Sequence, residues 1–440
     1  MARRKHHCLI LHGEAGAVVR EILIIADDLT GALDTGIQFG AGKISIQIGP
    51  EGFRKWKETA ADMPVCIVDA ETRHMKPEDA YRTVYDLAAQ AREAGIQYVY
   101  KKTDSALRGN VGSELSAVLE AYGAPRLFFA PAFPKMRRIT RGGVHYIDGC
   151  PVADSVFGQD PYEPVQASRV EQILQRGCCN VPVHAISAQT EELPEGILAY
   201  DCATDEEMAR IAGQVLDQPG PHLLAGCAGF AAALSNCLGL AGQRVERPPF
   251  SLPLSVICGS KNPVTVGQVE AVQQRGAVRI PMAVAEKLDS VWMDTPAGRQ
   301  RLLHWKEQLE GSGCSILESF SDLEGEDLQA SAQAAGMEKE AVRLRIASAM
   351  GATLKRLLEL GLERTLLITG GDTLLAFLKQ AVPNRLSPVC EVVPGVVCLR
   401  MEYGGKTYLL LTKSGGFGDR QLMEKLWDIV GQSAENGVSR

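Results

Sequence analysis

The chain has 440 residues, of which 45% are hydrophobic and 22% are charged, and its formal net charge is -7. This length is enough for two or three domains with substantial cores, and the composition is that of a soluble globular protein rather than a disordered or fibrous one. The negative net charge opposes binding to a phosphate backbone, so we expect no nucleic-acid partner.

The N-terminal residues and the cysteines exclude several further classes. Residues 1–20 begin with basic residues, but charged side chains interrupt the apolar stretch, which predicts an N-terminal appendage rather than a secretory signal. No run of 18 apolar residues occurs, so we expect a cytoplasmic protein with no membrane partner. The 12 cysteines include no C-x2-C pair and no spaced Cys/His clusters, so we expect reduced thiols and no metal site formed by them.

From Glu21 onward, short apolar runs alternate with helical segments. EILIIA, KISIQIG, VCIVDA, IQYVYKK and RLFFA predict strands, and helices are expected up to Phe39, over about 77–94 and over 111–122. Strands that alternate with helices predict a parallel sheet covered on both faces. Ligands of such sheets bind beyond the carboxyl ends of the strands, so side chains at those ends are the first candidates for a site.

The segment ERPPF, around 247–250, predicts a domain boundary because two prolines break any helix. We place the first domain at 21–247 and the second at 248–440. In the second, PLSVICGS and TLLITGG predict strands, AVQQRGAVRIP leads to another, and apolar positions from Val342 to Leu358 predict a helix. The charged stretch over about 298–336 is expected to form solvated helices and loop. The sequence therefore predicts two α/β domains with mainly parallel sheets.

An acidic motif, IADDLTGALDTG, joins the first predicted strand to a helix. It contains Asp27, Asp28 and Asp34. A helix N-cap needs only one such residue, for about 1 kcal/mol of stability. Two adjacent aspartates at a strand end repel each other, which favours a role in binding hydroxyl groups or facing a metal. The Asp-Thr-Gly tripeptide within the motif does not indicate an aspartic protease, because that chemistry needs two carboxylates on an all-β scaffold.

A second motif, KKTDSALRG, follows the strand IQYVY and precedes a helix. It gathers Lys101, Lys102, Asp104, Ser105 and Arg108 within eight positions. Cations suit a carboxylate or phosphate, and aspartate and serine side chains hydrogen-bond hydroxyl groups. Helix N-termini normally prefer acidic to basic side chains, so cations here indicate an anionic ligand. The motif predicts a site for an anionic, polyhydroxylated small molecule.

Two further polar segments follow predicted strands. Glu71 and Arg73 come directly after VCIVDA, and the loop after PAFP carries Arg137, Arg138 and Arg141. The first pair joins the set of strand-end candidates. The arginines of the loop are equally compatible with a solvated surface and with an extension of the anion site.

Glycine-rich turns follow three strands of the second half. Glycine lets backbone N–H groups approach a phosphate closely, and a helix N-terminus adds a favourable dipole. Three such turns in one domain predict binding of the phosphates of a nucleotide. Their residues are Gly259 and Ser260; Gly370, Gly371, Asp372 and Thr373; and Lys413, Ser414, Gly415 and Gly416.

Neither of the two common nucleotide signatures is present. GGKT, ending at Thr407, lacks the first glycine of a Walker loop and precedes a strand rather than a helix, so we expect a hairpin turn. No G-x-G-x-x-G follows the first strand, which disfavours a dinucleotide-binding dehydrogenase.

A series of motifs from about residue 22 to 417 resembles the four-carbon acid sugar kinase family. In chain order these motifs are IADDLTGALD, KKTDSALRG, PAFP with the arginine loop and YIDGCPV, DPYEPV, GSKNPVT, GGDT and KSGGFG. Members of this family phosphorylate threonate, erythronate or oxo-tetronate with ATP. The resemblance implies an N-terminal acid-sugar domain and a C-terminal nucleotide domain that face each other across a cleft. DTGIQ is most similar to the threonate-type branch.

The resemblance also implies residue roles. For the sugar acid it implies binding by Asp28, Arg73, Lys102, Asp104 and Ser105. For ATP it implies binding by Ser260, Gly370, Gly371, Asp372, Thr373 and Gly415. The chain departs from the family pattern at three places: Arg137-Arg138-Ile139-Thr140 replaces the usual Gly-Arg-Thr-Thr, Ala106 replaces a common threonine, and Asp372 an often-found glutamate.

The sequence hypothesis is transfer of the γ-phosphoryl group of ATP, with Mg²⁺, to the terminal hydroxyl of a small sugar acid. Arg73 and Lys102 would hold the substrate carboxylate, and either Asp28 or Asp104 would accept the hydroxyl proton. Asp27, Lys101, Ser105 and Arg108 complete the expected substrate set. The alternatives are a non-catalytic sugar-acid-binding protein and, less favoured, a sugar-acid dehydrogenase. A homo-oligomer is left open.

Overall fold

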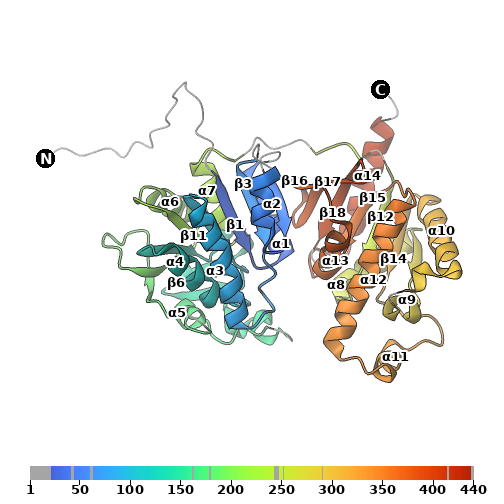
Figure 1. Ribbon diagram of the computed structural model, residues 1–440, viewed down its shortest axis with the longest axis horizontal. Helices are drawn as coiled ribbons and strands as arrows, with labels where there is room; N and C mark the ends of the chain where they lie inside the picture. The colour runs from blue at the N-terminus through green and yellow to red at the C-terminus, as the bar shows by residue number, and fades with distance from the viewer. Residues whose placement is uncertain are drawn as a thin grey trace.

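The computed structural model describes residues 21–40, 44–59, 63–160, 163–177, 180–241, 247–250, 252–289, 291–413 and 416–437. Two α/β domains lie side by side, coloured blue to green and yellow to red in Figure 1. The chain passes from one to the other between α7 (Ala228–Cys237) and β12 (Leu254–Cys258), the segment that holds the predicted boundary at 247/248. The predicted appendage, 1–20, lies outside the described residues.

The first domain is built on a sheet that has eight strands in the described part of the chain, all parallel, in the order β2-β3-β1-β4-β11-β5-β10-β9. The central strands are formed by apolar runs such as ILIIA and are buried on both faces, as helix-covered parallel strands must be. The strands are β1 (Ile22–Ala26), β2 (Ile44–Ile48), β3 (Val65–Asp69), β4 (Tyr98–Lys102), β5 (Arg126–Ala130), β9 (Val183–Ile186), β10 (Gly196–Tyr200) and β11 (His222–Gly226).

The second domain has a seven-stranded sheet among its described residues, in the order β13-β14-β12-β15-β18-β17-β16. The first five strands in this order, β13, β14, β12, β15 and β18, pair in parallel. At one edge, β17 pairs antiparallel with both β18 and β16. Both domains are thus α/β with mainly parallel sheets, as the sequence predicts. The remaining strands are β13 (Val278–Pro281), β14 (Cys314–Glu318), β15 (Thr365–Thr369), β16 (Arg385–Val393), β17 (Val396–Tyr403) and β18 (Lys406–Lys413), with β6 (Arg138–Arg141), β7 (Val144–Ile147) and β8 (Cys150–Pro151) in a small antiparallel sheet of the first domain.

Helices cover both large sheets. Those of the first domain, besides α7, are α1 (Leu29–Gly36), α2 (Gly52–Thr59), α3 (Pro77–Glu93), α4 (Val111–Tyr122), α5 (Val170–Leu174) and α6 (Asp205–Leu216). Those of the second are α8 (Pro263–Gln274), α9 (Val284–Leu288), α10 (Pro296–Glu310), α11 (Leu328–Ala334), α12 (Lys339–Glu359), α13 (Gly371–Ala381) and α14 (Leu422–Gly437). Short 3-10 helices are η1 (Ile37–Phe39), η2 (Pro134–Met136), η3 (Val152–Asp154), η4 (Val156–Gln159) and η5 (Trp292–Asp294). Among the described residues, none of these is long and apolar enough to span a bilayer.

The strand order reverses once in each sheet. From β1 the chain adds β3 and β2 on one side and then β4 on the other, and from β12 it adds β14 and β13 before β15 on the other side. At such a reversal the connections leave in opposite directions and open a crevice beyond the strand ends. The crevices therefore lie after β1 and β4 and after β12 and β15, where the sequence motifs stand.

One prediction about the second domain is wrong. The stretch over about 298–336 was expected to be solvated helices and loop, but β14 runs fully buried through the second sheet, between β13 and β12. Its terminal Glu318 is 0% exposed, and the burial of its carboxylate is compensated by Arg279 Nη2, at 2.9 Å, and by the N–H groups of Phe320 and Ser321. A five-residue strand is easily missed when it is flanked by charged helices. The GGKT segment is a β17–β18 hairpin turn, as expected.

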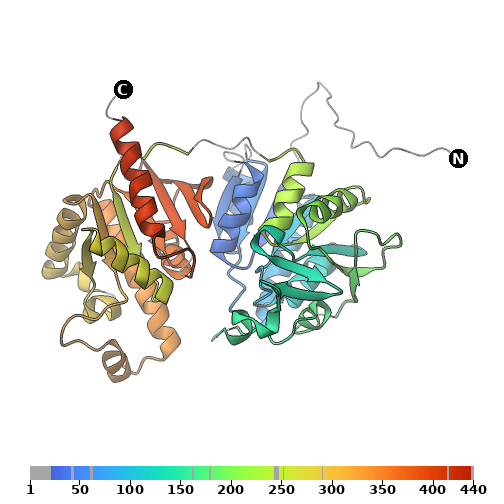
Figure 2. The same cartoon turned by 180° about the vertical axis from the view of Figure 1, so that it is seen from behind.

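The two domains contact each other through elements at their facing sides. β2 lies beside β16 and α1 beside α13, and both ribbon views place the blue strands next to the red ones (Figures 1 and 2). Buried apolar side chains from both domains, including Leu33 and Leu374, belong to one continuous cluster. Across this boundary Lys379 Nζ lies 2.6 Å from Glu71 Oε2.

Candidate functional site

One arginine holds the acidic residues at the end of β1. Arg73 Nε donates to Asp27 Oδ2 at 2.8 Å, and its two Nη atoms donate to the two oxygens of Asp28 at 2.8 and 2.7 Å. Asp28 also caps α1, because its Oδ1 accepts a hydrogen bond from Gly31 N at 2.9 Å. The two adjacent carboxylates are therefore compensated within the fold, and Arg73 is committed to them.

Asp104 is held in the same way by a second arginine. Arg108 Nε and Nη2 donate to its two oxygens at 2.9 and 3.1 Å, and Arg73 Nη2 lies 3.8 Å away. Burial by itself would raise the pKa of Asp104, but the charges of Arg73 and Arg108 outweigh it and hold the pKa well below its usual range. Asp104 is a firmly ionised carboxylate at neutral pH.

The two adjacent lysines of β4 point to opposite faces of the sheet, as neighbouring strand residues must. Lys102 faces α1: a Cβ added to Gly31 would lie 2.6 Å from its Nζ, so only glycine leaves room for it there. Lys101 is 0% exposed and lies 3.1 Å from Glu114 Oε2 on the other side. Lys102 is thus brought to the candidate site and Lys101 is not.

A cavity of about 280 Å³, here the first-domain cavity, opens beyond β1 and β4. Six residues of the expected substrate set line it, whereas Asp27 does not. The second domain closes one side with Glu391, Pro394, Gly395, Val397 and Phe417. The six expected residues are Asp28, Arg73, Lys102, Asp104, Ser105 and Arg108.

The arginine loop divides between the site and the surface. Arg138 lines the first-domain cavity, where its Nη1 donates to Ser105 Oγ and its guanidinium lies 5.3 Å from the centroid of the Phe157 ring. Arg137 points outward toward Asp148, at 3.3 Å, and Arg141 is exposed. Among the described residues, neither Lys102 nor Arg138 forms an ion pair with a carboxylate, so these two cations are available to an anionic ligand.

A larger cavity of about 1090 Å³, the second-domain cavity, lies beyond β12 and β15. The N-termini of α12 and α13 face it, and Met337, Val342 and Ile346 give it an apolar wall. Gly370, with φ +104, turns the chain from β15 into α13. Of the predicted nucleotide residues, the structure gathers Gly259, Ser260, Gly370, Gly371, Asp372, Thr373 and Gly416 here.

The other predicted nucleotide residues lie elsewhere or are not described. Ser414 and Gly415 fall outside the described residues. Lys413 does not line the second-domain cavity; it is 4% exposed, and its Nζ lies 3.1 Å from Thr265 Oγ1. Burial lowers the pKa of this lysine to about 8. Gly259 has a packing role as well, because a Cβ there would lie 1.8 Å from Thr373 Oγ1.

The two cavities meet at a narrow junction between the domains, here the junction cavity. Thr30 and Asp34 of α1 line both the first-domain and the junction cavity, and Gly370 and Gly371 line both the second-domain and the junction cavity. Lys413 also lines the junction. A Cβ added to Gly371 would lie only 3.3 Å from Thr30 Oγ1, so the domains touch here.

Sequence reasoning missed Asp34, Thr30 and the second-domain residues of the first-domain cavity as site residues. Thr30 and Asp34 are four residues apart on one helix, which puts them on the same face. That spacing is the sequence signal that could have identified both residues as site residues. Nothing local marks Glu391 or Gly395, because only the docking of the second domain brings them to the site.

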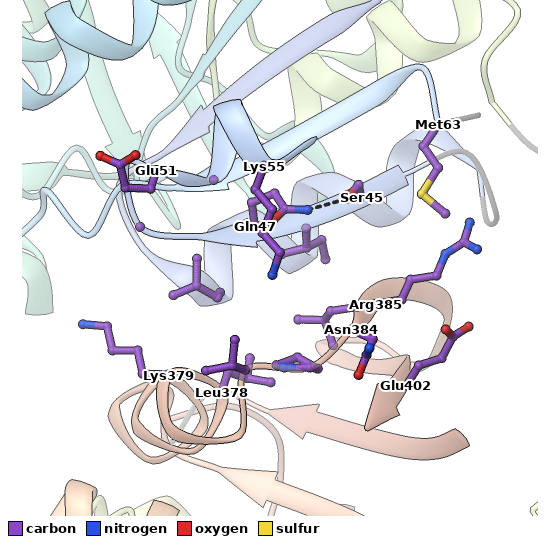
Figure 3. Close-up of a pocket in the computed structure, with 17 residues that line it drawn as sticks. Ser45, Gln47, Glu51, Lys55, Met63, Leu378, Lys379, Asn384, Arg385 and Glu402 are labelled. Carbon is purple, nitrogen blue, oxygen red and sulfur yellow. Dashed lines mark hydrogen bonds between the residues drawn. The ribbon is translucent and has the colours of Figure 1, made fainter. Parts of the chain in front are cut away.

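A further cavity of about 470 Å³ lies where the edge strands of the domains meet, and Figure 3 shows its walls. Ser45, Gln47 and Lys55 come from the first domain, with Gln47 Nε2 donating to Ser45 Oγ at 2.7 Å, and Arg385 and Glu402 come from the second. None of the predicted site residues lines it. Among the described residues, no group of three or more His, Cys, Asp or Glu is placed to hold a metal ion.

The fold and site define a two-domain α/β protein in which a cavity rich in charged side chains meets a glycine-lined cavity at a junction between the domains. Residues 22–234 match the sugar-binding N-terminal domain, and residues 255–423 match the nucleotide-binding C-terminal domain. The chain belongs to the four-carbon acid sugar kinase family.

Similar proteins cover nearly the whole chain. The D-threonate kinase of Salmonella typhimurium is 26% identical, over 93% of this chain and 98% of the relative. The D-threonate kinase of Bordetella bronchiseptica is 28% identical, over 91% and 95%. A solved structure from Salmonella typhimurium LT2, described as a putative tRNA synthase, shares the fold with a TM-score of 0.71 at 20% identity, over 92% of this chain and 98% of that one. Other relatives are named D-erythronate kinase and 3-oxo-tetronate kinase.

Proposed function

We propose that the protein is an ATP-dependent kinase that phosphorylates the terminal hydroxyl of a four-carbon sugar acid. The observation that carries the proposal is the junction, where Thr30 and Asp34 of one cavity meet Gly370 and Gly371 of the other. Phosphoryl transfer needs an acceptor oxygen and a terminal phosphorus aligned at close range, and little other covalent chemistry from the protein. The kinase names of the relatives support the same reaction class.

In this proposal the substrate carboxylate binds Lys102 and Arg138. Both cations line the first-domain cavity, and Arg138 Nε is buried with no hydrogen-bond partner among the described residues. A charge-assisted hydrogen bond contributes roughly 1.5–3 kcal/mol. Arg73 was expected to hold the substrate carboxylate, but three hydrogen bonds already join it to Asp27 and Asp28. In this proposal it instead positions those two carboxylates to receive substrate hydroxyls.

The triphosphate would lie against the turns of the second-domain cavity. Its volume of about 1090 Å³ and apolar wall suit a purine nucleotide, and the N-terminus of α13, with Gly370 and Gly371 bare of side chains, suits the phosphates. Mg²⁺ would neutralise the phosphate charge, and Asp372, which lies in the first turn of α13 and pairs with Arg343, would be its carboxylate ligand. Lys413 at the junction adds a positive charge near the terminal phosphate.

The test is a panel of four-carbon acids with ATP and Mg²⁺. We expect ADP formation with at least one acid, threonate first among them, and a ³¹P NMR product signal coupled to the terminal CH₂. Ligand-induced thermal shifts without turnover would instead establish a binding protein. Absorbance change with a nicotinamide cofactor would establish a dehydrogenase.

A variant at the junction tests the nucleotide site separately. In Gly371→Val, the added side chain would stand at the meeting point of the domains and over the phosphate turn. We expect weaker ATP binding by calorimetry, with sugar-acid binding retained. Unchanged ATP affinity would show that the nucleotide binds elsewhere.

A further inference from the structure

The proposed reaction needs a group that takes the proton of the attacking hydroxyl, and the two aspartates suggested by the sequence are poorly suited to it. Asp28 accepts two hydrogen bonds from Arg73 and one from Gly31 N. Asp104 accepts two from the side chain of Arg108, and its pKa lies well below its usual range. The carboxylate of Asp28 is thus occupied by protein donors, and a carboxylate as strongly stabilised as an anion as that of Asp104 is a weak base.

Asp34 has the opposite surroundings. It lies on α1, half-buried, and lines both the first-domain and the junction cavity. Among the described residues, its carboxylate makes no hydrogen bond or ion pair, unlike those of Asp27, Asp28 and Asp104. A carboxylate that faces two cavities without a protein partner is open to a ligand hydroxyl.

Position along the route between the cavities gives the second argument. A sugar acid held by Lys102 and Arg138 must extend its hydroxyl toward Gly370 and Gly371 to meet the phosphate. Among the described residues of α1, only Thr30 and Asp34 line both the first-domain cavity and the junction cavity.

We infer that Asp34 is the general base of the transfer reaction, an inference that rests on the proposed kinase function. In the step, the O–H bond of the substrate breaks and its proton passes to a carboxylate oxygen of Asp34. The freed oxygen forms a bond to the γ-phosphorus while the bond from that phosphorus to the bridging oxygen breaks. ADP leaves with the electron pair, and the proton on Asp34 passes to solvent afterwards.

The electrostatics agree with this role. Burial raises the pKa of Asp34 to about 6, with Asp28 and Glu391 acting in the same direction and Lys102 and Arg138 against it. Lys413 faces the same junction from β18. A base that is mostly ionised at neutral pH, yet more basic than an ordinary carboxylate, is what proton transfer near pH 7 favours.

The test compares the wild type with Asp34→Asn, Asp34→Glu and the matched control Asp86→Asn, an exposed aspartate of α3 outside every cavity described above. For Asp34→Asn we expect kcat to fall by about 10²–10⁴-fold, while the KM for the acid and the thermal shifts by the acid and by ATP stay nearly unchanged. Asp34→Glu, which keeps a displaced carboxylate, should retain part of the activity. Asp86→Asn should match the wild type.

The pH profile separates a base from a structural residue. The wild-type kcat should fall about tenfold per pH unit below about pH 6, and this acid limb should persist in Asp34→Glu and vanish in the residual activity of Asp34→Asn. An Asp34→Asn enzyme with near-wild-type kcat, with an unchanged acid limb, or with kcat intact and KM raised would overturn the assignment. If Asp34→Asn fails to fold, an Asp34→Glu profile without the acid limb has the same consequence. A wild type without turnover on any acid would overturn the proposed function itself.

Discussion

Protonation of His145 should destabilise the protein below neutral pH. The ring is 0% exposed in β7, next to the first-domain cavity. Its Nε2 lies 3.0 Å from the Ser105 carbonyl oxygen, which can only accept, and its Nδ1 lies 3.0 Å from Thr140 Oγ1. These partners define a neutral ring that donates from Nε2 and links β6 and β7 to the loop after β4. Burial lowers the pKa of His145 to about 4, and the charge of Arg138 acts in the same direction.

The sign and size follow from proton linkage. In the unfolded chain the histidine has its ordinary pKa of 6.5, so at acidic pH the unfolded state binds a proton that the native state does not. Stability from this group is therefore complete above about pH 6.5 and is lost as the pH falls toward about 4. Between about pH 7.5 and about pH 5, the two pKa values give a loss of about 2 kcal/mol.

The comparison is with His145→Gln, whose side-chain amide can still donate toward the Ser105 carbonyl but does not titrate. Urea unfolding of both proteins at the two pH values gives two differences in unfolding free energy. The wild type should lose about 2 kcal/mol more than the variant on acidification, whatever the variant costs at neutral pH. Equal losses, or a His145 NMR resonance that titrates near 6.5, would refute the reasoning.

Three further substitutions test other contacts. Gly259→Ala should destabilise the protein by about 1–3 kcal/mol in urea unfolding and weaken ATP binding, because its Cβ would meet Thr373 Oγ1. Thr373→Ala in the same chain should recover part of the lost stability. An equal cost of Gly259→Ala with Thr373 and with Ala at that position would contradict the close contact. Arg73→Lys should raise the KM for the acid at least about tenfold, because lysine lacks the planar fork that binds a strand-end carboxylate twice; an unchanged KM would contradict this. Glu114→Gln leaves Lys101 buried without its counter-charge and should cost about 3–5 kcal/mol of stability with the KM for the acid unchanged, whereas a KM effect would place Lys101 at the site after all.

Much of the architecture was readable from local patterns. Runs such as ILIIA are buried strands because a helix-covered parallel sheet excludes water from both faces, and Pro77 begins α3 because its fixed φ suits a first helical turn. The strand-end motifs were found for the same reason: polar residues directly after a buried strand must lie at the open edge of the sheet. β14 was missed because its five residues, CSILE, include only three apolar ones, too few to stand out between charged helices.

The amino-acid sequence by itself determined the two α/β domains, their polar strand ends and the glycine turns, since each depends on residues close together in the sequence. Only the tertiary structure decided which of two adjacent lysines faces the cavity, that Arg73 is occupied by Asp28, and that Asp34 and Gly371 share one junction. Those outcomes depend on strand order and on the docking of one domain against the other. Such contacts join residues on different elements, 45 positions apart for Arg73 and Asp28, and no local periodicity encodes them.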